Sequence, residues 1–443
     1  MPVSFFVILK LHICYNQTMA KKRRKKKKVI ILFIEVFVLV LTMGLALILL
    51  LAEKQKKDAP DSNKGVIVIK EEEIADNDND KTIESEQDKS STDEILDDGT
   101  RYGYILADEE LCAKERIYAR NAKSEDCITL LFAGDVGLGQ GYANLGNLIK
   151  KNGDVTEVFN EDALATMRGA DIFMINNEFT FTTRGEPTPD KTYTFRCDPK
   201  YAYVLQDMGV DIVSLANNHS YDYGEVSLTD TIDTLDGIDM PYVGAGYNIE
   251  EAVKPVYFIV NDTRIAIVSA TQIERLSTPD TKGATKTSAG TFRCWYDDRI
   301  LDVIKEAKEC SDYVIAYIHW GTELEEAPDW AQLELAPKLA KAGADLIVGD
   351  HPHILQKLDY VENSPVIYSL GNYWFNSKEM DTGLLEAKIF TDGGGMDVRF
   401  IPVVQKNCSS VIVKNSERDR ILEYMRLISP GVDIDEDGYI SRK

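Results

Sequence analysis

Short apolar runs that each end in a polar segment recur along the chain from about residue 128 onward. Amphipathic stretches such as Glu161–Arg168 and Trp330–Lys341 lie between several of these runs. Apolar runs of this length, rich in Ile, Val and Leu, are typical of buried strands. Their first residues are Ile128, Asp171, Asp211, Arg264, Tyr313 and Asp345. The alternation of strand and helix predicts a layered α/β domain with a largely buried sheet.

The end of this region has a different texture. Leu384–Lys414 alternates in the manner of antiparallel strands, so we place one folded domain at residues 124–415 and a C-terminal tail at 416–443. Within that tail, Asp433–Ile440 matches the first part of an EF-hand loop, but the chain ends before the glutamate of position 12. A tight Asp-Gly turn is the favoured interpretation of this segment.

The polar segments at the strand ends are expected to meet. The carboxyl ends of parallel strands share one edge of a sheet, and ligands of open α/β sheets bind there. Four of the five histidines of the chain occur in these segments. Among them, His351 and His353 are two residues apart, a spacing that in an extended segment projects both side chains to the same side. The segments are Gly134–Gly137, Asn176–Glu178, Asn217–His219, His319–Gly321 and Gly349–His353.

The residue types in these segments favour a metal site. Imidazole is the commonest metal ligand in proteins and also a convenient general acid or base near pH 7. Two carboxylates, an amide oxygen and three or four imidazoles form a mixed nitrogen and oxygen set, which suits Mn, Fe, Zn or Co better than calcium. Taken singly, each segment has an ordinary explanation, such as a turn after a strand. Their convergence on one sheet edge is what favours the metal.

The N-terminal part predicts a membrane anchor. Val29–Ala52 is a run of 24 residues that carries one charge, Glu35, and is long enough to cross a hydrocarbon core of about 30 Å. Eight consecutive basic residues, 21–28, precede it and should stay in the cytoplasm, so the rest of the chain would face outward. A cleaved signal peptide is the competing interpretation. Residues 1–28 are then a cytoplasmic tail, and we interpret residues 1–18 of this tail as an upstream extension of the gene model.

Beyond the anchor the chain is acidic. Its net charge is −23 despite the basic cluster, which argues against nucleic acid or anionic lipid as a partner of the bulk surface. Residues 53–123 contain long stretches of Asp, Glu, Lys, Ser and Asn, and we expect them to form a disordered spacer. Six cysteines follow the anchor without a Cys-x-x-Cys motif, so disulfides remain open, with Cys112 and Cys127 the one close pair.

An ordered series of motifs resembles the bacterial CapA family of poly-γ-glutamate capsule biosynthesis proteins. The resemblance covers about residues 128–405, and supporting pieces are Lys191–Arg196, Gly244–Gly246 and Lys341–Asp345. The motifs are Gly-Asp-Val at 134–136, Asn-Asn-Glu at 176–178, Leu-Ala-Asn-Asn-His-Ser-Tyr-Asp-Tyr-Gly at 215–224, His-Trp-Gly-Thr-Glu at 319–323, Gly-Asp-His-Pro-His at 349–353 and Tyr-Ser-Leu-Gly-Asn-Tyr-Trp-Phe at 368–375.

CapA-like domains are similar in turn to calcineurin-like metallophosphoesterases. The resemblance therefore implies an αββα sandwich of metallophosphoesterase type and a two-metal centre. Position by position it implies that Asp135 is a metal ligand, Glu178 the carboxylate that bridges two metals, and Asn218 the amide ligand. It also implies that His219 protonates the leaving oxygen. The remaining implied ligands are His319, His351 and His353.

Two positions depart from the metallophosphoesterase pattern. Those enzymes have Asp-x-His on the first strand, whereas this chain has Gly137 at the histidine position, so the centre would hold two ions unequally or only one. Asp350 stands before His351 where a small residue or histidine is usual, and would support the ligands from outside.

Arg196 and Lys191 are candidate clamps for a substrate carboxylate or phosphate. Asn372 is a third candidate for substrate binding.

Two functional hypotheses remain open from the sequence. In the first, the chain is a single-pass cell-membrane protein with an extracellular, metal-dependent hydrolase or transferase domain that acts on a surface polymer, a phosphate ester or a γ-glutamyl substrate. In the second, it is a non-catalytic metal-binding subunit that helps to synthesise, retain or export an anionic capsule polymer. Both imply a divalent metal, Mn, Fe or Zn, and other membrane subunits of a capsule synthesis complex as partners.

Overall fold

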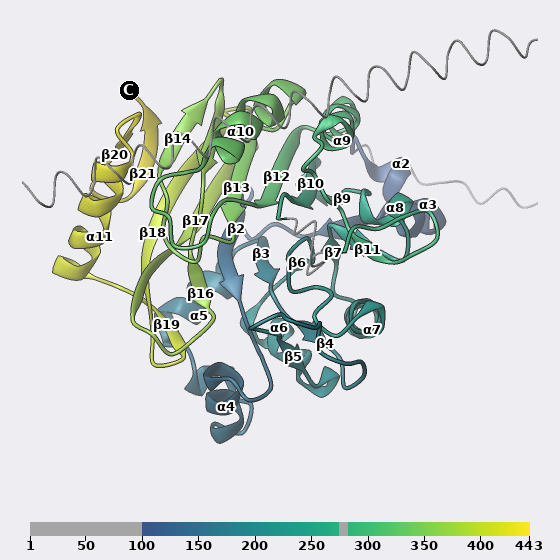
Figure 1. Cartoon of the computed structure of the whole chain (residues 1–443). Helices are drawn as coiled ribbons and strands as arrows, with labels where there is room; N and C mark the ends of the chain where they lie inside the picture. Colours follow the sequence, from purple (N-terminus) through teal and green to yellow (C-terminus); the bar gives the residue numbers. More distant parts are fainter. Residues whose placement is uncertain (1–99, 274–281) are drawn as a thin grey trace, which may run out of the picture. The chain divides into compact units, whose positions relative to one another are not determined.

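A computed structural model describes residues 100–273 and 282–443 of the chain (Figure 1). The expected basic tail, the anchor at 29–52 and most of the acidic spacer lie outside the described residues. Among the helices of the described ranges, none is both long and apolar enough to span a membrane. The described strands form two large sheets, and each runs mostly parallel in the part that carries the predicted strand ends.

The first sheet has seven strands in the order β1-β9-β10-β12-β13-β15-β14. Neighbouring pairs from β10 to β15 are parallel, whereas β9 and β14 each form an antiparallel pair with their neighbours β10 and β15. The bounds are β1 Ile117–Arg120, β9 Val256–Val260, β10 Thr263–Thr271, β12 Tyr313–His319, β13 Leu346–Asp350, β14 Leu358–Val361 and β15 Ser364–Ile367.

The second sheet has ten strands, eight of them in the order β20-β21-β18-β17-β2-β3-β6-β7, while β16 pairs with β2 and β19 with β18. Strands β2, β3, β6 and β7 are parallel. On the other side of β2, the short strand β16 is also parallel to it, whereas β17 and the strands beyond are antiparallel to their neighbours, as the alternation after Leu384 predicts. The bounds are β2 Cys127–Val136, β3 Ile172–Asn177, β6 Ile212–Ser214, β7 Tyr242–Val243, β16 Asn372–Trp374, β17 Met380–Phe390, β18 Met396–Lys406, β19 Ser409–Ile412, β20 Val432–Ile434 and β21 Tyr439–Arg442.

The two sheets pack face to face, with helices on their outer faces (Figure 1). Strand β2 shows why: Leu130 and Phe132 point into the core between the sheets, while Leu131 and Ala133 point into the core under the helices. Because successive side chains of a strand face opposite ways, a strand buried on both faces must be apolar throughout. The architecture is therefore α/β with four layers, as expected from the sequence.

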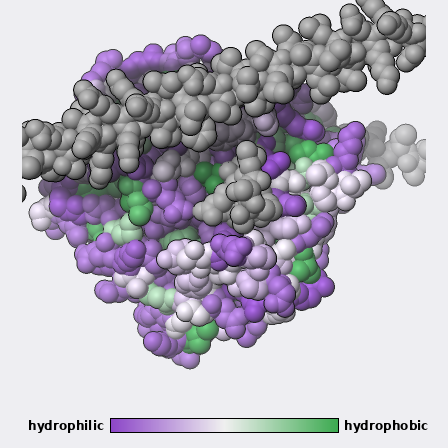
Figure 2. Space-filling model, viewed as in Figure 1, coloured by the Kyte–Doolittle hydropathy of each residue, from purple (hydrophilic) through white to green (hydrophobic). Residues whose placement is uncertain are grey.

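The outer helices divide between the two sheets. Helices α9 (Asp298–Glu309) and α10 (Trp330–Ala342) cover the seven-stranded sheet. The outer core of the ten-stranded sheet is shared with α4 (Ala143–Lys150), α5 (Glu161–Gly169), α6 (Tyr203–Met208) and α7 (Glu225–Asp236). On the face seen in Figure 2, the described surface is largely hydrophilic and its hydrophobic patches are small and separate.

Two segments differ from the expected boundaries. Part of the expected spacer is folded: α2 (Gly103–Leu106) and α3 (Glu109–Glu115) precede β1, which pairs with β9. The expected tail is also folded: α11 (Asn415–Ile428) is followed by the β20–β21 hairpin, which extends the ten-stranded sheet through β18. Both segments are rich in charged residues, but each also contains apolar residues that are buried. These include Ile105 and Ile117 in the first segment, and Ile421, Leu422 and Met425 in the second.

The structure also describes the turn of the β20–β21 hairpin and the state of Cys112 and Cys127. The turn between β20 and β21 is a tight one, in which Asp435 Oδ1 accepts from the backbone N–H groups of Asp437 and Tyr439 and Gly438 has a φ of 90°. This is the Asp-Gly turn expected in preference to a calcium loop. Cys112 and Cys127 are both free thiols, so this close pair forms no disulfide.

Four aspartates fix the register of the parallel strands at their amino ends. Each precedes one strand and accepts a hydrogen bond from a backbone N–H at the start of the neighbouring strand. The pairs are Asp171 with Thr129, Asp211 with Phe173, Asp312 with Arg264 and Asp345 with Val314, at 2.7, 2.9, 2.8 and 2.8 Å respectively. Because these contacts satisfy donors that the ladder leaves unpaired, they define where each strand begins.

Replacement of one of these aspartates should destabilise the fold. Asp171 is buried and also accepts from the N–H of Lys123 at 2.7 Å, so Asp171→Ala leaves two donors without partners. We expect a loss of about 2–3 kcal/mol in the free energy of unfolding, measured by urea denaturation. Asp302→Ala is the matched control, because Asp302 is exposed and pairs only with Lys305, and it should change stability by less than about 0.5 kcal/mol. Equal effects of the two variants would contradict this role.

Candidate metal centre

The carboxyl ends of strands from both sheets bring the predicted ligands together. Asp135 lies at the end of β2, Glu178 directly after β3 and Asn218 after β6, all from the ten-stranded sheet. The seven-stranded sheet contributes His319 at the end of β12, with His351 and His353 directly after β13. All of these side chains are buried except that of His353, which is 16% exposed. The predicted metal set therefore forms one cluster.

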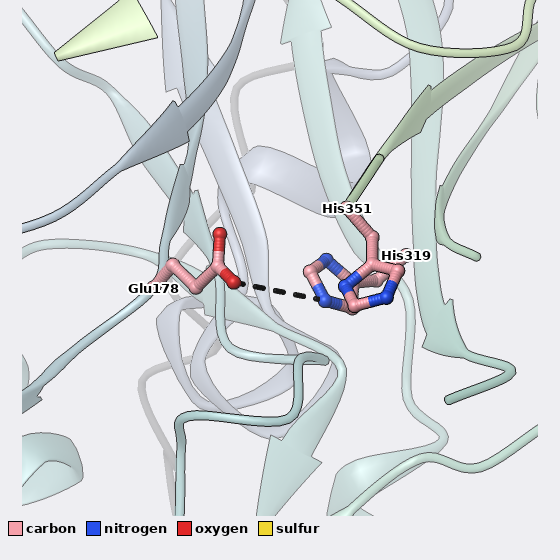
Figure 3. Close-up of side chains that lie close together, drawn as sticks. All are labelled: Glu178, His319 and His351. Atoms are coloured by element: carbon pink, nitrogen blue, oxygen red, sulfur yellow. Dashed lines mark ion pairs between the residues drawn. The ribbon is translucent and has the colours of Figure 1, made fainter. Parts of the chain in front are cut away.

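A single carboxylate oxygen stands at the centre of this cluster. Glu178 Oε1 lies 3.8 Å from His219 Nε2, 4.0 Å from His319 Nε2 and 4.0 Å from His353 Nε2. Figure 3 shows the Glu178 carboxylate directed toward His319, with His351 beside that ring. None of these separations is a hydrogen bond, and Glu178 Oε1 has no hydrogen-bond partner in the part of the chain that the structure describes. The three imidazole nitrogens thus surround an oxygen that none of them bonds.

Among the described residues, the donor atoms form three overlapping groups, and within each group they lie within 4.8 Å of one another. Glu178, His319 and His351 form the first group, Asp135, Glu178 and His353 the second, and Asp135, His319 and Asp350 the third. Glu178 belongs to the first two groups. His319 Nε2 also lies 2.8 Å from Asn218 Oδ1, so the amide can join the first group.

Unsatisfied polar atoms test whether an ion fits. Glu178 Oε1, His351 Nδ1 and Asp350 Oδ2 are buried without a hydrogen-bond partner. Leaving one such atom unpaired costs about 1–3 kcal/mol, and more when the group is charged. A divalent cation would satisfy the first two as ligands. The mixed oxygen and nitrogen donors fit Mn, Fe or Zn, so the residues present fit a divalent metal.

The pKa directions describe a site that lacks positive charge. Burial, then the charges of Asp135 and Asp350, raise the pKa of Glu178 well above its usual range. Burial lowers the pKa of His319 to about 3 and that of His351 well below its usual value. Both rings are therefore neutral near pH 7, and neutral imidazole is the form that binds a metal.

Asp135 and His353 form a separate ion pair within the cluster. His353 Nδ1 lies 2.9 Å from both Asp135 Oδ2 and Asn372 Oδ1. Burial opposes the charge on each partner, but their hydrogen bond and mutual attraction outweigh it, so the pKa of His353 is raised and that of Asp135 is lowered. Asn372 enters the cluster because β16 pairs with β2 at Asp135. Asn372, the candidate residue for substrate binding, thus contacts the predicted ligand His353.

The predicted proton donor belongs to a chain of buried polar groups. His219 Nδ1 lies 2.8 Å from Asp222 Oδ2, which directs Nε2 toward Glu178. Asp222 also accepts from the backbone N–H of Phe195 and from Lys191 Nζ, both at 2.6 Å. Burial lowers the pKa of His219, and Asp222 acts against it. Sequence reasoning missed Asp222, although a carboxylate three residues after the histidine was a usable signal.

Lys191 and Arg196 lie in other surroundings than a substrate clamp would need. The Lys191 side chain is only 6% exposed, and its Nζ donates to Asn218 O and to Asp222, so it stabilises the loop that carries His219. The Arg196 guanidinium lies 4.5 Å from the centre of the Tyr223 ring. It also lines a cavity of about 380 Å³ that includes Lys200 but none of the predicted metal ligands.

Asn176 and Asp350 both contact His319, and Asn176 does so across the two sheets. Asn176 Nδ2 donates to Asp135 Oδ1 at 2.9 Å and lies 3.3 Å from His319 Nδ1. Asp350 Oδ1 lies 2.9 Å from the same His319 nitrogen, where it can fix the tautomer of a ligand from outside, as expected. Sequence reasoning named Asn176 only as part of a motif. The β2–β3 register, which places Asn176 beside Asp135, is what reveals its role.

The His-Pro-His segment is not extended, so the same-side argument for it was wrong. His351 and His353 have φ values of 94° and 62°, and both lie in the left-handed region. Backbone hydrogen bonds from Trp320 N to Asp350 O and from Leu324 N to Pro352 O hold this loop. The two rings enter the cluster separately: His351 packs 4.6 Å from His319, centre to centre, while His353 contacts Asp135.

Phe375 occupies the space beside Gly137. A Cβ atom added to Gly137 would lie 2.9 Å from Phe375 Cδ2, closer than real Cβ contacts allow. The centre of the same ring lies 4.8 Å from that of His353, at an angle of 37°, and 5.4 Å from that of Phe195, at an angle of 78°. A histidine at position 137 would therefore need Phe375 to move. The group of Asp135, Glu178 and His353 has no fourth side-chain donor from the first strand.

Comparison with known proteins identifies relatives over the same region. The family model described as "Bacterial capsule synthesis protein PGA_cap" matches residues 129–377. The chain is 30% identical to the PGA biosynthesis protein CapA of Bacillus subtilis over 61% of this chain and 70% of that protein. It is 30% identical to the capsule biosynthesis protein CapA of Bacillus anthracis over 52% and 57%. It is 28% identical to a probable polyglutamine synthesis accessory protein of Mycobacterium tuberculosis over 48% and 58%.

One solved structure in this comparison is a 5'-nucleotidase from Candida albicans SC5314. It is 11% identical, covers 64% of this chain and 52% of that chain, and has a TM-score of 0.34. The family match is sufficient to assign the chain to a family, because it spans more than half of the chain and includes every residue of the buried cluster. The chain therefore belongs to the bacterial capsule synthesis protein family PGA_cap, as its motif series indicates.

Proposed function

We propose that this protein is a membrane-anchored CapA-like protein of surface polymer biosynthesis, with a metal-dependent hydrolase or transferase site. The observation that carries the proposal is Glu178 Oε1, buried and unbonded among three imidazole nitrogens. The polymer follows from the relatives, which are named for PGA or capsule biosynthesis. The outward orientation follows from the basic cluster and apolar run of the sequence.

The four-layer architecture and the placement of the ligands support a site of metallophosphoesterase type. Two of the donor groups share Glu178, and their residues would hold one or two Mn, Fe or Zn ions with Glu178 as the common ligand. When bound, such ions lower the pKa of a water toward neutrality and clamp the oxygens of an in-line displacement. The substrate is then a phosphate ester or a γ-glutamyl bond of the polymer.

The residues of the chain supply the proton and its control. Asp222 accepts from His219 Nδ1 and stabilises the doubly protonated ring, which gives its Nε2 proton to the leaving group. Lys191 and the Phe195 N–H hold Asp222 in place and keep it from rotating away. Asp350 orients His319 in the same way on the opposite side of the cluster. These contacts preorganise the site.

A second function is favoured by the Phe375 contact. If the group of Asp135, Glu178 and His353 binds its ion weakly, the centre would be a metal-binding platform that assists synthesis, retention or export of the anionic polymer. Other membrane subunits of a capsule synthesis complex would then perform the chemistry. Metal would link the acidic protein to the acidic polymer. The hypotheses differ in turnover, so the same variants test both.

Removal of a ligand should remove metal. We expect His351→Gln to lose most of the metal bound by the purified full chain, as measured by elemental mass spectrometry. The reason is that His351 Nδ1 is a buried ring nitrogen without a hydrogen-bond partner among the described residues and is free to bind a metal. His219→Gln is the matched control and should keep its metal, since His219 belongs to none of the donor groups found among the described residues. We expect fewer than two ions per chain in the wild type, because Gly137 offers no ligand. Metal retained by His351→Gln would argue against the proposed ligand set.

Removal of the proton donor should affect turnover alone. We expect His219→Gln to lower kcat by about 10²–10⁴ with the metal content unchanged, and Asp222→Asn to lower it by less. Turnover is measured on bis-p-nitrophenyl phosphate and on γ-glutamyl oligomers. A wild type that is fully loaded with metal and cleaves neither, with no difference from His219→Gln, would reject the enzyme and favour the platform.

Metal binding should release protons and strengthen as pH rises. The pKa of Glu178 is raised by burial and by its acidic neighbours, so the empty site holds a proton there that a cation must displace. The folded pKa is raised, so the stability of the metal-free protein falls as pH increases through it, while affinity for the ion increases. Calorimetric titration in two buffers of different ionisation enthalpy gives the number of protons released. A pH-independent affinity would contradict this charge balance.

A further inference from the structure

Two of the four tryptophans of the chain are exposed and lie together. Trp320 and Trp374 are fully buried, whereas Trp295 is 45% and Trp330 66% exposed. The rings of Trp295 and Trp330 lie 5.9 Å apart, centre to centre, at an angle of 88°. Exposed indoles are uncommon on a surface without a binding role, because each leaves a large apolar face in water.

The two indoles form the walls of a small cavity of about 180 Å³, which we call the tryptophan cleft. Its other lining residues are Gln272, Asp297, Ala331, Glu334, Leu335 and Lys338. Gln272 directly follows β10, and its backbone N–H donates to the carbonyl of the predicted ligand His319 at 2.8 Å. The cleft therefore lies next to the metal cluster, on the same edge of the seven-stranded sheet.

One residue that lines the cleft has a buried acceptor without a donor among residues 100–273 and 282–443. Gln272 is only 8% exposed, and within these ranges its Oε1 has no hydrogen-bond partner. A buried acceptor of this kind destabilises the protein unless a ligand or a water supplies the missing proton. The lining of the cleft thus combines an unused hydrogen-bond acceptor with two aromatic rings.

The charges of the cleft restrict what it can hold. Lys338 Nζ pairs with Asp297 at 2.6 Å and with Glu334 at 3.0 Å, so the one cation is already neutralised by two carboxylates. An anionic ligand would meet the net negative charge, and a cationic ligand would have to displace Lys338. A purely apolar group would leave Gln272 Oε1 unpaired. A neutral ligand that donates hydrogen bonds meets all three conditions.

From these contacts we infer that the tryptophan cleft binds one unit of a neutral saccharide. The hydroxyl groups of a sugar are donors for Gln272 Oε1 and the free carboxylate oxygens, and its C–H face packs on the electron-rich face of an indole. The volume is below the 300–1,000 Å³ typical of drug-sized ligands, which suits one unit of a longer chain. This inference does not depend on the proposed activity of the metal centre.

The test is titration of the full chain with tetra-N-acetylchitotetraose and with cellotetraose, both neutral, followed by tryptophan emission. We expect a saturable change with at least one of them, because half of the tryptophans line the cleft. Trp330→Ala and Gln272→Leu should each weaken binding at least about tenfold, and Trp330→Phe should restore part of it. Leu427→Ala, at an exposed residue of α11, is the control and should bind as the wild type does.

Several results would overturn the inference. One is the absence of a saturable change in the wild type with either saccharide. Another is unchanged binding by Trp330→Ala, and a third is emission that depends on protein concentration together with a dimer in sedimentation, which would assign the cleft to a second copy of the chain. Binding that persists after chelation of metal separates this result from failure of the metal centre. Far-UV circular dichroism of each variant excludes loss of the fold.

Discussion

The site depends on an unbalanced burial of negative charge where the two sheets meet. Asp135, Glu178 and Asp350 are fully buried, and two of the imidazoles beside them, His319 and His351, are neutral near pH 7. Only the His353 ion pair compensates for part of this charge. Buried carboxylates without cations are strongly disfavoured, so the cluster must either hold protons or hold a metal. The strand ends, the loops and the hydrogen-bond supports all serve this one requirement.

Much of this arrangement could be predicted from the sequence, for a simple reason. The predicted ligands Asp135, Glu178 and His319 each stand where an apolar run ends, and strand ends converge on one edge. What could not be predicted depends on the backbone between elements. The left-handed φ values of His351 and His353 follow from loop hydrogen bonds with no sequence signature. Likewise, α11 is packed through three buried residues in a charged segment, and composition alone suggested a tail.

Gly137 is one of the positions at which the chain departs from the metallophosphoesterase motif. Its surroundings in the structure explain the glycine, and the sequence motifs alone do not reveal them. Phe375 comes from the motif at the far end of the matched region and fills the space beside this glycine. A missing ligand and an inserted aromatic ring are thus two sides of one change. The ring also packs on His353 and so rigidifies the group that it leaves short of a donor.

The aspartates at the strand starts have a consequence for how the site can vary. Asp171, Asp211, Asp312 and Asp345 fix the strands at the edge remote from the ligands. A slip by one residue would turn every side chain of a strand to the opposite face, and these contacts oppose it. Insertions in the loops at the other edge are therefore absorbed locally. Chemistry at one edge can change over evolution while the opposite edge keeps the frame in register.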